Sequence, residues 1–332
     1  MTSDNYRQQH DMLPPKEQDA GKYWHGKPYY SLDAYCKNTF QHKCYKIALN
    51  TLMSCPNRDG HLSTRGCIFC SAGGSGDFAV TTAGKSIREQ LTEGIAMFGD
   101  KKIGRHFIAY FQAYTNTYGP TDYLRQVYTE ALSCPDVCGI SIATRPDCLP
   151  EEVLSLLAEL KAAFPDKFIW VELGLQTIHE ETAAFIRRGY ALPCFADAFA
   201  RLKAIDIPVI IHVILGLPHE TQEMMLETIA YLNECKPFGI KLQLLHILEN
   251  TDLADYYRNE NFEALTKEEY LDLVIDCLEQ LSPEIVVHRV TGDGPKDLLI
   301  APRWSLHKRD VLNSLHKLMK ERGALQGTKF QA

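Results

Sequence analysis

The feature that most constrains the fold is a regular alternation of short apolar runs with amphipathic stretches. The apolar runs, rich in Ile, Val, Leu and Phe, cover residues 46–53, 107–114, 139–144, 168–175, 208–215 and 239–247. The stretches between them space their apolar residues by three or four positions and cover residues 85–98, 121–133, 150–164, 193–205 and 220–235. The first pattern predicts strands and the second predicts helices, so the chain repeats a strand–helix unit.

Strands that are apolar along their whole length are typical of a parallel sheet with helices on its faces. Six units in succession predict an α/β fold in the form of a partial (βα)6 TIM-like barrel, with chemistry at the carboxyl ends of the strands. A flat, doubly wound sheet is the alternative. We expect an N-terminal arm over residues 1–45, the barrel core over 46–250 and a C-terminal extension over 251–332. The extension should contain helices at 266–281 and 305–322 and a β-like run at 285–290.

A cysteine-rich insertion lengthens the first unit by about 30 residues relative to the common strand–helix spacing. It contains Cys55, Cys67 and Cys70 with the spacing C-x11-C-x2-C. Three thiolates can hold a [4Fe–4S] cluster and leave one iron open for a ligand, whereas a closed structural zinc site needs four ligands. The number of cysteines therefore favours an iron–sulfur cluster.

Two other interpretations of these cysteines stay open. Zinc could be bound with Cys44, His42 or His61 as the fourth ligand. A thioredoxin-like redox pair fits less well, because Cys67 and Cys70 do not begin an obvious helix after a strand. The sequence alone does not exclude either alternative.

The cysteine content and the absence of export signals together indicate a reducing compartment. No run of about 18 uncharged apolar residues exists, and residues 1–18 lack the apolar segment of a secretory signal. We therefore expect a cytoplasmic protein without a membrane span. Its eleven cysteines are then expected as thiols, metal ligands or core residues rather than disulfides. Cys36 and Cys44, which precede the barrel, are candidates for an accessory site.

Several motifs together resemble the radical S-adenosylmethionine (SAM) superfamily. They are SCPNRDG, GCIFCSAGGSGDFA, YFQAYTNTY, SIATRPDCL, ELGLQT and HVILGLPHET, in this order over roughly residues 30–310. Within the superfamily they resemble the YtqA/YhcC group, which is related to the elongator catalytic subunit and to the coproporphyrinogen dehydrogenase branch. The C-x11-C spacing departs from the superfamily's commonest C-x3-C-x2-C, although longer loops occur in the elongator branch.

The resemblance implies a mechanism and its cofactors. In the superfamily, a [4Fe–4S] cluster on three cysteines binds SAM through its amino and carboxylate groups. One-electron reduction then cleaves SAM to methionine and a 5′-deoxyadenosyl radical, which abstracts hydrogen from a substrate carbon. The implied partners are SAM and an electron donor such as flavodoxin or ferredoxin.

Polar residues after the second and third apolar runs are candidates for SAM contacts. Gln112, Thr115 and Asn116 lie where the resemblance places the superfamily's Gly-Gly-Glu segment, which meets the methionyl amino group; an Asn/Thr turn is the alternative. Thr144 and Arg145 put a cation near the expected carboxylate, for which a guanidinium is geometrically suited. A salt bridge to the aspartate two residues later is the alternative for this arginine.

The fourth and fifth runs supply the other candidates. Glu172 and Gln176 are four apart, so they face the same side of the strand, and a charge in so apolar a run needs a partner or a function. Gln176 matches a glutamine of the coproporphyrinogen dehydrogenase relatives, and Arg188 matches their SAM-contacting arginine. His212 stands where these relatives have an aspartate, so it is either a ribose contact or a histidine of the core. Gly216 lets the backbone approach adenine closely. Further residues able to close the barrel over a substrate are His246, Glu249, His288, Arg289, Asp293 and Trp304.

The resemblance to the YtqA/YhcC group also implies a substrate, the wobble uridine of tRNA, whose carboxymethylaminomethyl group is converted towards aminomethyl. The net charge of −7 disfavours nucleic acid, but residues 301–332 carry +5. The candidates for phosphate contacts, or for a solvated helix face, are Lys308, Arg309, Lys317 and Lys320. The rival substrate is a small metabolite or peptide handled inside the barrel, and the rival class is a zinc-stabilised, non-catalytic binding protein.

Overall fold

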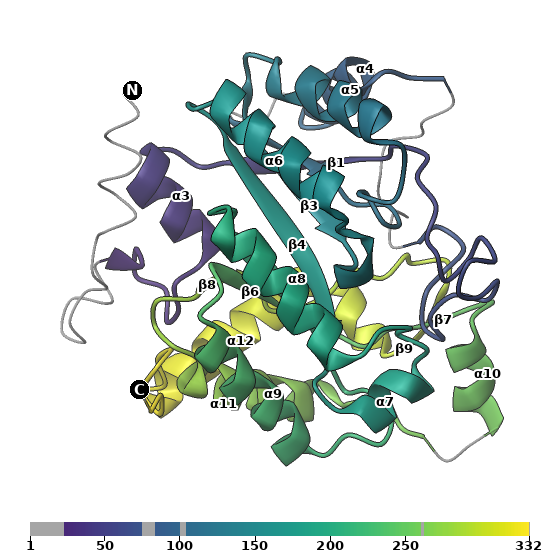
Figure 1. Ribbon diagram of the computed structural model, residues 1–332. Helices are drawn as coiled ribbons and strands as arrows, with labels where there is room; N and C mark the ends of the chain where they lie inside the picture. Colours follow the sequence, from purple (N-terminus) through teal and green to yellow (C-terminus); the bar gives the residue numbers. More distant parts are fainter. Residues whose placement is uncertain (1–22, 75–83, 100–103, 260–261, 332) are drawn as a thin grey trace.

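A seven-stranded parallel sheet organises the chain (Figure 1). The computed structural model describes residues 23–74, 84–99, 104–259 and 262–331. The strands, in chain order, are β1 (Tyr45–Leu49), β2 (Phe107–Phe111), β3 (Val137–Thr144), β4 (Phe168–Gln176), β5 (Val209–Leu215), β6 (Gly239–Leu244) and β8 (Val286–Arg289). Each pairs in parallel with the next. In the described ranges β1 and β8 are the two edges and do not pair with each other, so the sheet is an open half-barrel.

This architecture confirms the predicted partial barrel. All six predicted strands form, and the β-like run at 285–290 contributes a seventh strand from the C-terminal extension. The strands pair in the order in which they occur along the chain, which excludes the doubly wound alternative, because that fold reverses its strand order. Residues Ile247–Leu248 (β7) and Leu299–Ala301 (β9) form a separate antiparallel pair.

The side chains inside the half-barrel fall into layers because alternate residues of each strand point inward. The layer nearest the amino ends of the strands is apolar and contains Ile108, Trp170, Ile210 and Val286. Two residues further along, the layer is polar and contains Tyr110, Glu172, His212, Lys241 and His288. The interior is therefore closed by apolar packing at one end and polar toward the carboxyl ends of the strands.

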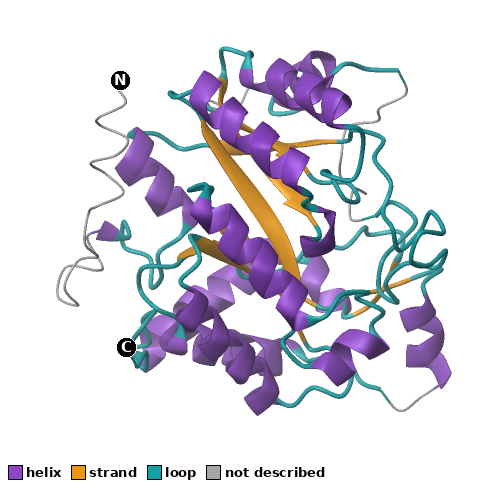
Figure 2. Ribbon diagram, viewed as in Figure 1, coloured by secondary structure: helices purple, strands orange, loops and turns teal. Residues whose placement is uncertain are grey.

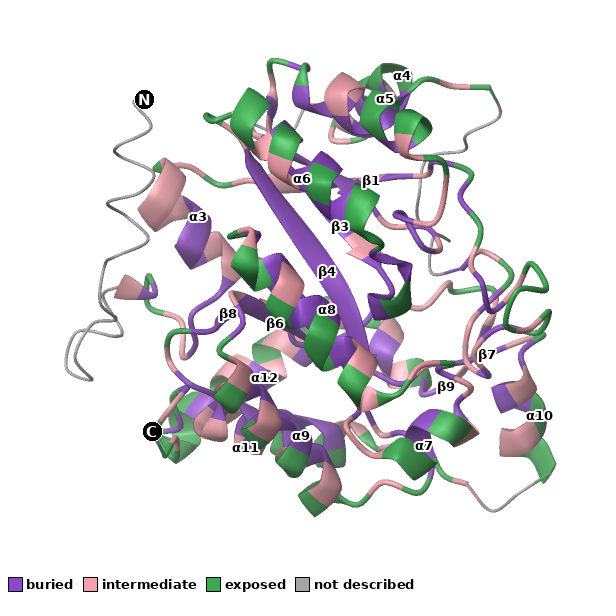
Figure 3. Ribbon diagram, in the orientation of Figure 1, coloured by how far each residue is buried: buried purple, intermediate pink, exposed green. Residues whose placement is uncertain are grey.

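Most helices in the described ranges cover the outer face of the sheet (Figure 2), but the first packs against the apolar layer at the amino ends of the strands, and the one over residues 252–259 lies beside β7. The helices are α3 (Leu32–Phe40), α4 (Ile87–Ala96), α5 (Thr121–Leu132), α6 (Glu151–Ala163), α7 (Glu180–Phe185), α8 (Leu192–Ala204), α9 (Gln222–Cys235), α10 (Asp252–Asn259), α11 (Lys267–Gln280) and α12 (Lys308–Arg322). The strand β4 is buried along almost its whole length, and the helices around it expose only their outer sides (Figure 3). No helix in the described ranges has the length and apolar character to cross a membrane.

Three helices were not expected from the periodicity, and the basic helix begins three residues later than predicted. The helices α3, α7 and α10 are short, at nine, six and eight residues, so they show little more than two turns of pattern. The basic helix α12 begins at Lys308 rather than near Ser305, because Arg303–Leu306 form a 3-10 turn after Pro302. Lys308 therefore lies in the first turn of this helix.

The described part of the arm and the end of the chain both pack against β8. The backbone of Val287 donates to the carbonyl of Tyr30 at 2.7 Å, and Ser31 forms a bridge with the same strand residue. The buried side chain of Gln326 accepts from the backbone of Tyr30 at 2.8 Å and donates to the carbonyl of Ser282 at 2.7 Å. The division into arm, core and extension stays a prediction, and residues 1–22 of the arm lie outside the described ranges.

Candidate active site

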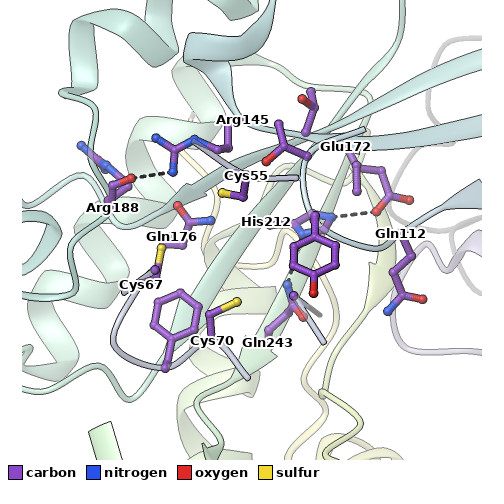
Figure 4. A pocket seen from close by; sticks show the side chains of 18 of the residues that line it. Cys55, Cys67, Cys70, Gln112, Arg145, Glu172, Gln176, Arg188, His212 and Gln243 are labelled. Atoms are coloured by element: carbon purple, nitrogen blue, oxygen red, sulfur yellow. Dashed lines mark hydrogen bonds and ion pairs between the residues drawn. The ribbon is translucent and has the colours of Figure 1, made fainter. Parts of the chain in front are cut away.

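A cavity at the carboxyl ends of the strands collects most of the predicted site residues (Figure 4). The space between its protein atoms is about 1000 Å³ when the open mouth is counted. The predicted residues that line it are Cys55, Cys67, Cys70, Gln112, Thr115, Thr144, Arg145, Glu172, Gln176, Arg188 and His212. Of the predicted SAM contacts, Asn116 and Gly216 do not belong to the lining. Of the residues expected to close the barrel, Arg289 also lines the cavity, whereas His246, Glu249, His288, Asp293 and Trp304 do not.

The three cysteines lie on one loop after β1, and polar side chains of the same loop brace it. Arg58 donates from Nη2 to the carbonyl of Cys70 at 2.7 Å. Asn57 donates from Nδ2 to the carbonyl of Arg187 at 2.8 Å and lies 3.5 Å from Sγ of Cys67. Burial raises the pKa of the Cys67 thiol to about 11. The Pro-Asn-Arg-Asp motif thus fixes the loop that presents the thiols to the cavity (Figure 4).

The side chains of this cavity fit a three-thiolate cluster. In the described residues no fourth cysteine lines it, and its one histidine, His212, is already bound to Glu172 and Gln243. Three thiolates are the ligand set that leaves one iron open. No group of three or more His, Cys, Asp or Glu side chains in the described part of the chain is close enough together to hold a single metal ion, and the three thiolates of a cluster need not be, because each binds a different iron.

The residues proposed as fourth zinc ligands lie away from the cavity. Cys44 and His42 precede β1 and so belong to the amino ends of the strands, and His61 is exposed and does not line the cavity. Cys44 instead lies beside Cys138 at the start of β3, with 3.8 Å between the two Sγ atoms. The buried thiol of Cys36 is also hydrogen-bonded to Cys44, so these cysteines form a cluster at the opposite end of the barrel.

Arg145 is buried in the cavity wall and held by a bidentate salt bridge. Its Nε and Nη2 donate to the carboxylate of Asp147 at 2.9 and 2.7 Å, and its Nη1 donates to the carbonyl of Arg188 at 2.9 Å. Burial works against the charge, but the contact with Asp147 raises the pKa of Arg145 above its usual value. The salt bridge considered from the sequence therefore exists. A contact with the carboxylate of SAM stays a prediction, and that carboxylate would have to share the guanidinium with Asp147.

Arg188 stabilises the end of β4. Its Nη1 donates to the carbonyls of Leu175 and Thr177 at 3.1 and 2.6 Å, and its Nε donates to the carbonyl of Tyr190 at 2.9 Å. Tyr190 in turn donates to the carbonyl of Gly174 at 2.9 Å. These contacts hold the carboxyl end of β4 in the irregular conformation that directs its last residue into the cavity.

Gln176, the last residue of β4, has φ of +62°, and the pairing with β5 shifts register beside it. Its Oε1 lies 3.0 Å from the hydroxyl of Tyr190. Glu172 and Gln176 both line the cavity, as predicted from their spacing of four residues. Their contact with SAM stays a prediction.

Glu172 is the centre of a buried polar network. Its Oε1 accepts from Lys46 Nζ and from Ser141 Oγ, both at 2.6 Å. Its Oε2 accepts from Lys241 Nζ and from His212 Nε2, the latter at 2.7 Å. The side chain is completely buried. Each carboxylate oxygen therefore has two donors, which accounts for a charge in an otherwise apolar strand.

The network fixes the protonation states of its members. Burial by itself would raise the pKa of Glu172, but the ammonium groups of Lys241 and Lys46 hold it well below its usual range. Burial, with a further contribution from Lys241, lowers the pKa of His212 to about 4. The ring of His212 is therefore neutral near pH 7; Nε2 carries the proton donated to Glu172, and Nδ1 accepts from Gln243 at 3.3 Å.

Asn116 and Gly216 have structural partners. Asn116 donates from Nδ2 to the carbonyls of Phe111 and Ala143 at 3.0 and 3.1 Å, which joins the ends of β2 and β3. Gly216 adopts φ of +84°, and a Cβ there would lie 2.9 Å from Leu265, so the position requires glycine. Roles for these two residues in SAM binding stay predictions.

The basic helix contains both paired and exposed cations. Lys308 donates to both carboxylate oxygens of Asp293 at 2.8 and 2.7 Å. Arg309, Lys317 and Lys320 are exposed, although Lys317 lies 3.8 Å from Glu321 on the same helix. The exposed part of the predicted phosphate-binding set is thus Arg309, Lys317 and Lys320. Its function stays a prediction.

Two family models match the chain. The model described as the radical SAM superfamily matches residues 61–232, more than half of the chain, including Cys67 and Cys70. The chain belongs to the radical SAM superfamily. A second model, the radical SAM C-terminal domain, matches residues 237–321. The chain is therefore a radical SAM enzyme whose cofactors are a [4Fe–4S] cluster and SAM, and the alternative of a non-catalytic zinc protein is wrong.

Two similar proteins of nearly the same length confirm the predicted resemblance to the YtqA/YhcC group. YtqA of Bacillus subtilis is 44% identical over 305 residues, which are 92% of this chain and 94% of that protein. YhcC of Escherichia coli K12 is 33% identical over 286 residues, 86% of this chain and 90% of that protein. A tRNA uridine(34) acetyltransferase of Methanocaldococcus jannaschii is 24% identical over 193 residues, 57% of this chain and 34% of that protein.

Among solved structures, the archaeal Elp3 of Methanocaldococcus infernus has the same fold as this radical SAM enzyme. The two superimpose with a TM-score of 0.64 at 15% sequence identity. The match covers 85% of this chain but only 64% of the Elp3 chain. At this identity the likeness extends to the fold alone.

Several cavity residues escaped the sequence analysis. The clearest are Lys241 and Gln243, which alternate with apolar residues on β6 and so face the interior, as Glu172 does on β4. The alternation that identified Glu172 could have identified them too. Lys46 had no such signal, because it lies at the beginning of an apolar run, where a lysine usually marks an exposed strand end. Lys46 faces the interior because β1 pairs with β2, which begins about 60 residues later in the sequence.

Proposed function

We propose that this radical SAM enzyme acts on the wobble uridine of tRNA and converts a carboxymethylaminomethyl side chain to an aminomethyl group. The observation that carries the substrate class is its similarity to a protein named tRNA uridine(34) acetyltransferase, and to Elongator complex protein 3, which is 22% identical in Homo sapiens over 76% of this chain. Position 34 is the wobble position. The similarity supports tRNA, while the side chain to be changed follows from the resemblance to the YtqA/YhcC group.

Different residues of the cavity would bind the two cofactors. Cys55, Cys67 and Cys70 would hold the cluster, and polar side chains of the same cavity, including Arg145 and Gln176, would orient SAM. When bound, these cofactors supply a 5′-deoxyadenosyl radical that abstracts hydrogen. The protein's part is to position the substrate carbon next to SAM and to exclude water. The apolar layer that closes the amino end of the half-barrel serves the second purpose.

The atoms and electrons of the proposed conversion balance when one water molecule is consumed. Oxidation by two electrons at the methylene carbon next to the carboxylate allows the carbon–nitrogen bond to be hydrolysed, which leaves the aminomethyl group and releases glyoxylate. SAM accepts the two electrons and one of the two protons released, and yields methionine and 5′-deoxyadenosine. No net reductant is consumed. A donor such as flavodoxin or ferredoxin is proposed only to start each turnover, in the cytoplasm.

The basic helix α12 would contact the tRNA backbone. Its exposed cations Arg309, Lys317 and Lys320 can release counterions from phosphates, which makes affinity fall with salt. Lys308 would contribute less, because Asp293 already neutralises it. Changing all four residues to Gln should weaken tRNA binding and flatten its salt dependence. A Lys203→Gln/Lys236→Gln variant, in which two exposed lysines of other elements change, is the matched control and should bind tRNA as the parent does.

The decisive experiment is mass spectrometry of tRNA nucleosides. A strain that lacks the gene should accumulate carboxymethylaminomethyluridine and lose its aminomethyl descendants. Purified, reconstituted enzyme with SAM and a reductant should convert such tRNA in vitro and release glyoxylate. Unchanged nucleosides in the deletion strain, together with no conversion in vitro, would overturn the proposal and favour a small metabolite or peptide as the substrate.

A further inference from the structure

The interior of the half-barrel contains more cations than carboxylates. Among the described residues that line the active-site cavity or the neighbouring cavity, Glu172 is the only carboxylate. Lys46, Lys241 and Arg289 come from β1, β6 and β8 and line the same space. Lys46 and Lys241 both bind Glu172, so two amine side chains share one carboxylate, and burial lowers the pKa of Lys241 well below its usual value. A buried excess of positive charge is costly unless an anion joins it.

The neighbouring cavity lies between the two edges of the sheet. It encloses about 1050 Å³, counting its open side, and its lining includes Leu32 of α3, Ile47 of β1, Gly94 of α4 and His288 of β8. The two cavities meet at four residues, Tyr110, Gln112, Lys241 and Arg289, which line both. A ligand in the second cavity can therefore extend past Lys241 toward the cysteine loop.

The cations around this junction retain hydrogen-bonding capacity. Nζ of Lys46 donates to Glu172 at 2.6 Å and otherwise lies over the ring of Tyr110, 4.7 Å from its centroid. Arg289 reaches Asp293 only at 3.4 Å, and Lys308 shares that carboxylate. These contacts use part of the donors of one ammonium and one guanidinium. The remaining N–H groups suit a carboxylate or phosphate oxygen.

His288 is a second, independent sign of a missing ligand. Its Nδ1 and Nε2 atoms are both buried without a hydrogen-bond partner, and its ring lines the second cavity. Trp170 and Phe238 pack against the ring edge to face, with centroids 5.5 Å away in both cases, so the ring is held in place. Buried polar groups that lack a partner commonly mark a site where a ligand or water binds.

We propose that Lys46, Lys241 and Arg289 form an anion subsite that takes the carboxylate of the substrate, with His288 beside it. In the terms of the proposed function, on which this inference rests, the anion is the carboxylate of the carboxymethylaminomethyl group. Holding that carboxylate at Lys241 directs the adjacent methylene carbon toward the cofactor cavity, because Lys241 lines both cavities. The subsite would thus select the carboxylate form of the side chain and position the carbon that is oxidised.

The test compares a carboxylate probe with its neutral amide. N-benzylglycine carries the carboxymethylaminomethyl group on a benzene ring, and in N-benzylglycinamide a neutral amide replaces the carboxylate. Binding of each to the reconstituted full chain is measured by saturation-transfer NMR and competition. We expect the parent to prefer the carboxylate by about 10- to 100-fold, as for a charge-assisted contact. The affinity for the amide serves as the internal reference, because damage to the fold lowers both affinities alike.

Two variants remove the subsite in different ways. Arg289→Gln removes a partly exposed cation at the rim, and Lys46→Gln removes one of the two ammonium groups that share Glu172. In each, the preference for the carboxylate should fall to within about 3-fold. Lys203→Gln, an exposed lysine on α8, is the control and should retain the parent's preference. Equal affinities in the parent, or an undiminished preference in Arg289→Gln, would overturn the proposal whether or not Lys46→Gln folds.

The tRNA assay separates this inference from the proposed function. If the parent converts modified tRNA and Arg289→Gln does so with the parent's KM, the subsite is wrong and the substrate class stands. If the parent does not convert tRNA but prefers N-benzylglycine over its amide through Arg289, the subsite is supported for a free carboxylate and the tRNA substrate is wrong. The two failures therefore give different results.

Discussion

The Nε2 atom of His212 lies 2.7 Å from Oε2 of Glu172, which joins β5 to β4 in the middle of the half-barrel. Gln243 lies 3.3 Å from the other ring nitrogen, so both nitrogens of His212 have protein partners. The sequence left a ribose contact and a core histidine as alternatives for this residue. The hydrogen bonds favour a structural role in the polar network. A ribose contact stays a prediction and would require His212 to exchange one of these partners for a hydroxyl.

The first prediction concerns the cluster. Anaerobically reconstituted protein should contain about four iron atoms per chain and absorb light broadly at about 400 nm. Cys55→Ala, Cys67→Ala and Cys70→Ala should each abolish both signals, because three thiolates are needed to hold the cluster. Iron analysis and absorption spectra measure this. Cys134→Ala and Cys277→Ala remove cysteines that do not line the cavity and should load normally. Full iron content in Cys67→Ala would contradict the assignment.

The second prediction concerns the buried charges around Glu172. Replacing Glu172 with Ala leaves the ammonium groups of Lys46 and Lys241 without their carboxylate. An uncompensated buried charge costs on the order of 3–5 kcal/mol of the free energy of unfolding. Denaturant unfolding should show this loss. The double variant Lys241→Met/Glu172→Gln removes one charge of each sign and should recover at least half of it, and an equal loss in both variants would show that packing rather than charge is responsible.

The strands and long helices could be predicted because each has many residues that obey one period. The helix α11, for example, begins with a capping box of Thr266 and Glu269 and alternates apolar and polar faces over fourteen residues. The polar network could be predicted only one residue at a time. Lys46 and Glu172 are 126 positions apart, and nothing in the sequence pairs them until the curvature of the sheet is known. The charge of Glu172 signalled that a partner must exist without identifying it.

The third prediction separates a structural arginine from a cofactor contact. Arg188→Ala removes hydrogen bonds to two backbone carbonyls at the end of β4 and to that of Tyr190, so it should lower the free energy of unfolding by about 2–4 kcal/mol and weaken SAM binding as well. Gln176→Ala removes an amide that faces the cavity and should weaken SAM binding about 10-fold with little loss of stability. Thermal unfolding and SAM titration measure the two effects. Normal stability in Arg188→Ala would show that the arginine acts on SAM directly.

The fourth prediction concerns the thiols at the amino ends of the strands. Hydrogen bonds from Cys138 and Cys36 lower the pKa of Cys44 well below its usual value, and the residue is only half-buried. Cys44 should therefore be alkylated by iodoacetamide at pH 7 before the buried Cys134. Peptide mass spectrometry over time measures the order. Cys138→Ala removes a hydrogen bond to the thiolate and should slow the reaction. An unchanged rate in that variant would show that the cluster does not activate Cys44.

The last prediction concerns acid stability and His246. Burial lowers the pKa of this histidine from 6.5 to about 4, and Nε2 lies 3.1 Å from Oγ of Ser305. Between pH 6.5 and 4 the unfolded chain therefore binds a proton that the folded chain does not, so stability falls as the pH falls through this window. Protonation of His246 should lower the free energy of unfolding by on the order of 2 kcal/mol at about pH 4.5. His246→Gln cannot titrate and should flatten the fall when denaturant unfolding is measured at several pH values. Ser305→Ala removes the hydrogen-bond partner but keeps the imidazole, so its free energy of unfolding should fall with pH as steeply as that of the parent. An equally steep fall in His246→Gln and the parent would assign the acid sensitivity to other groups.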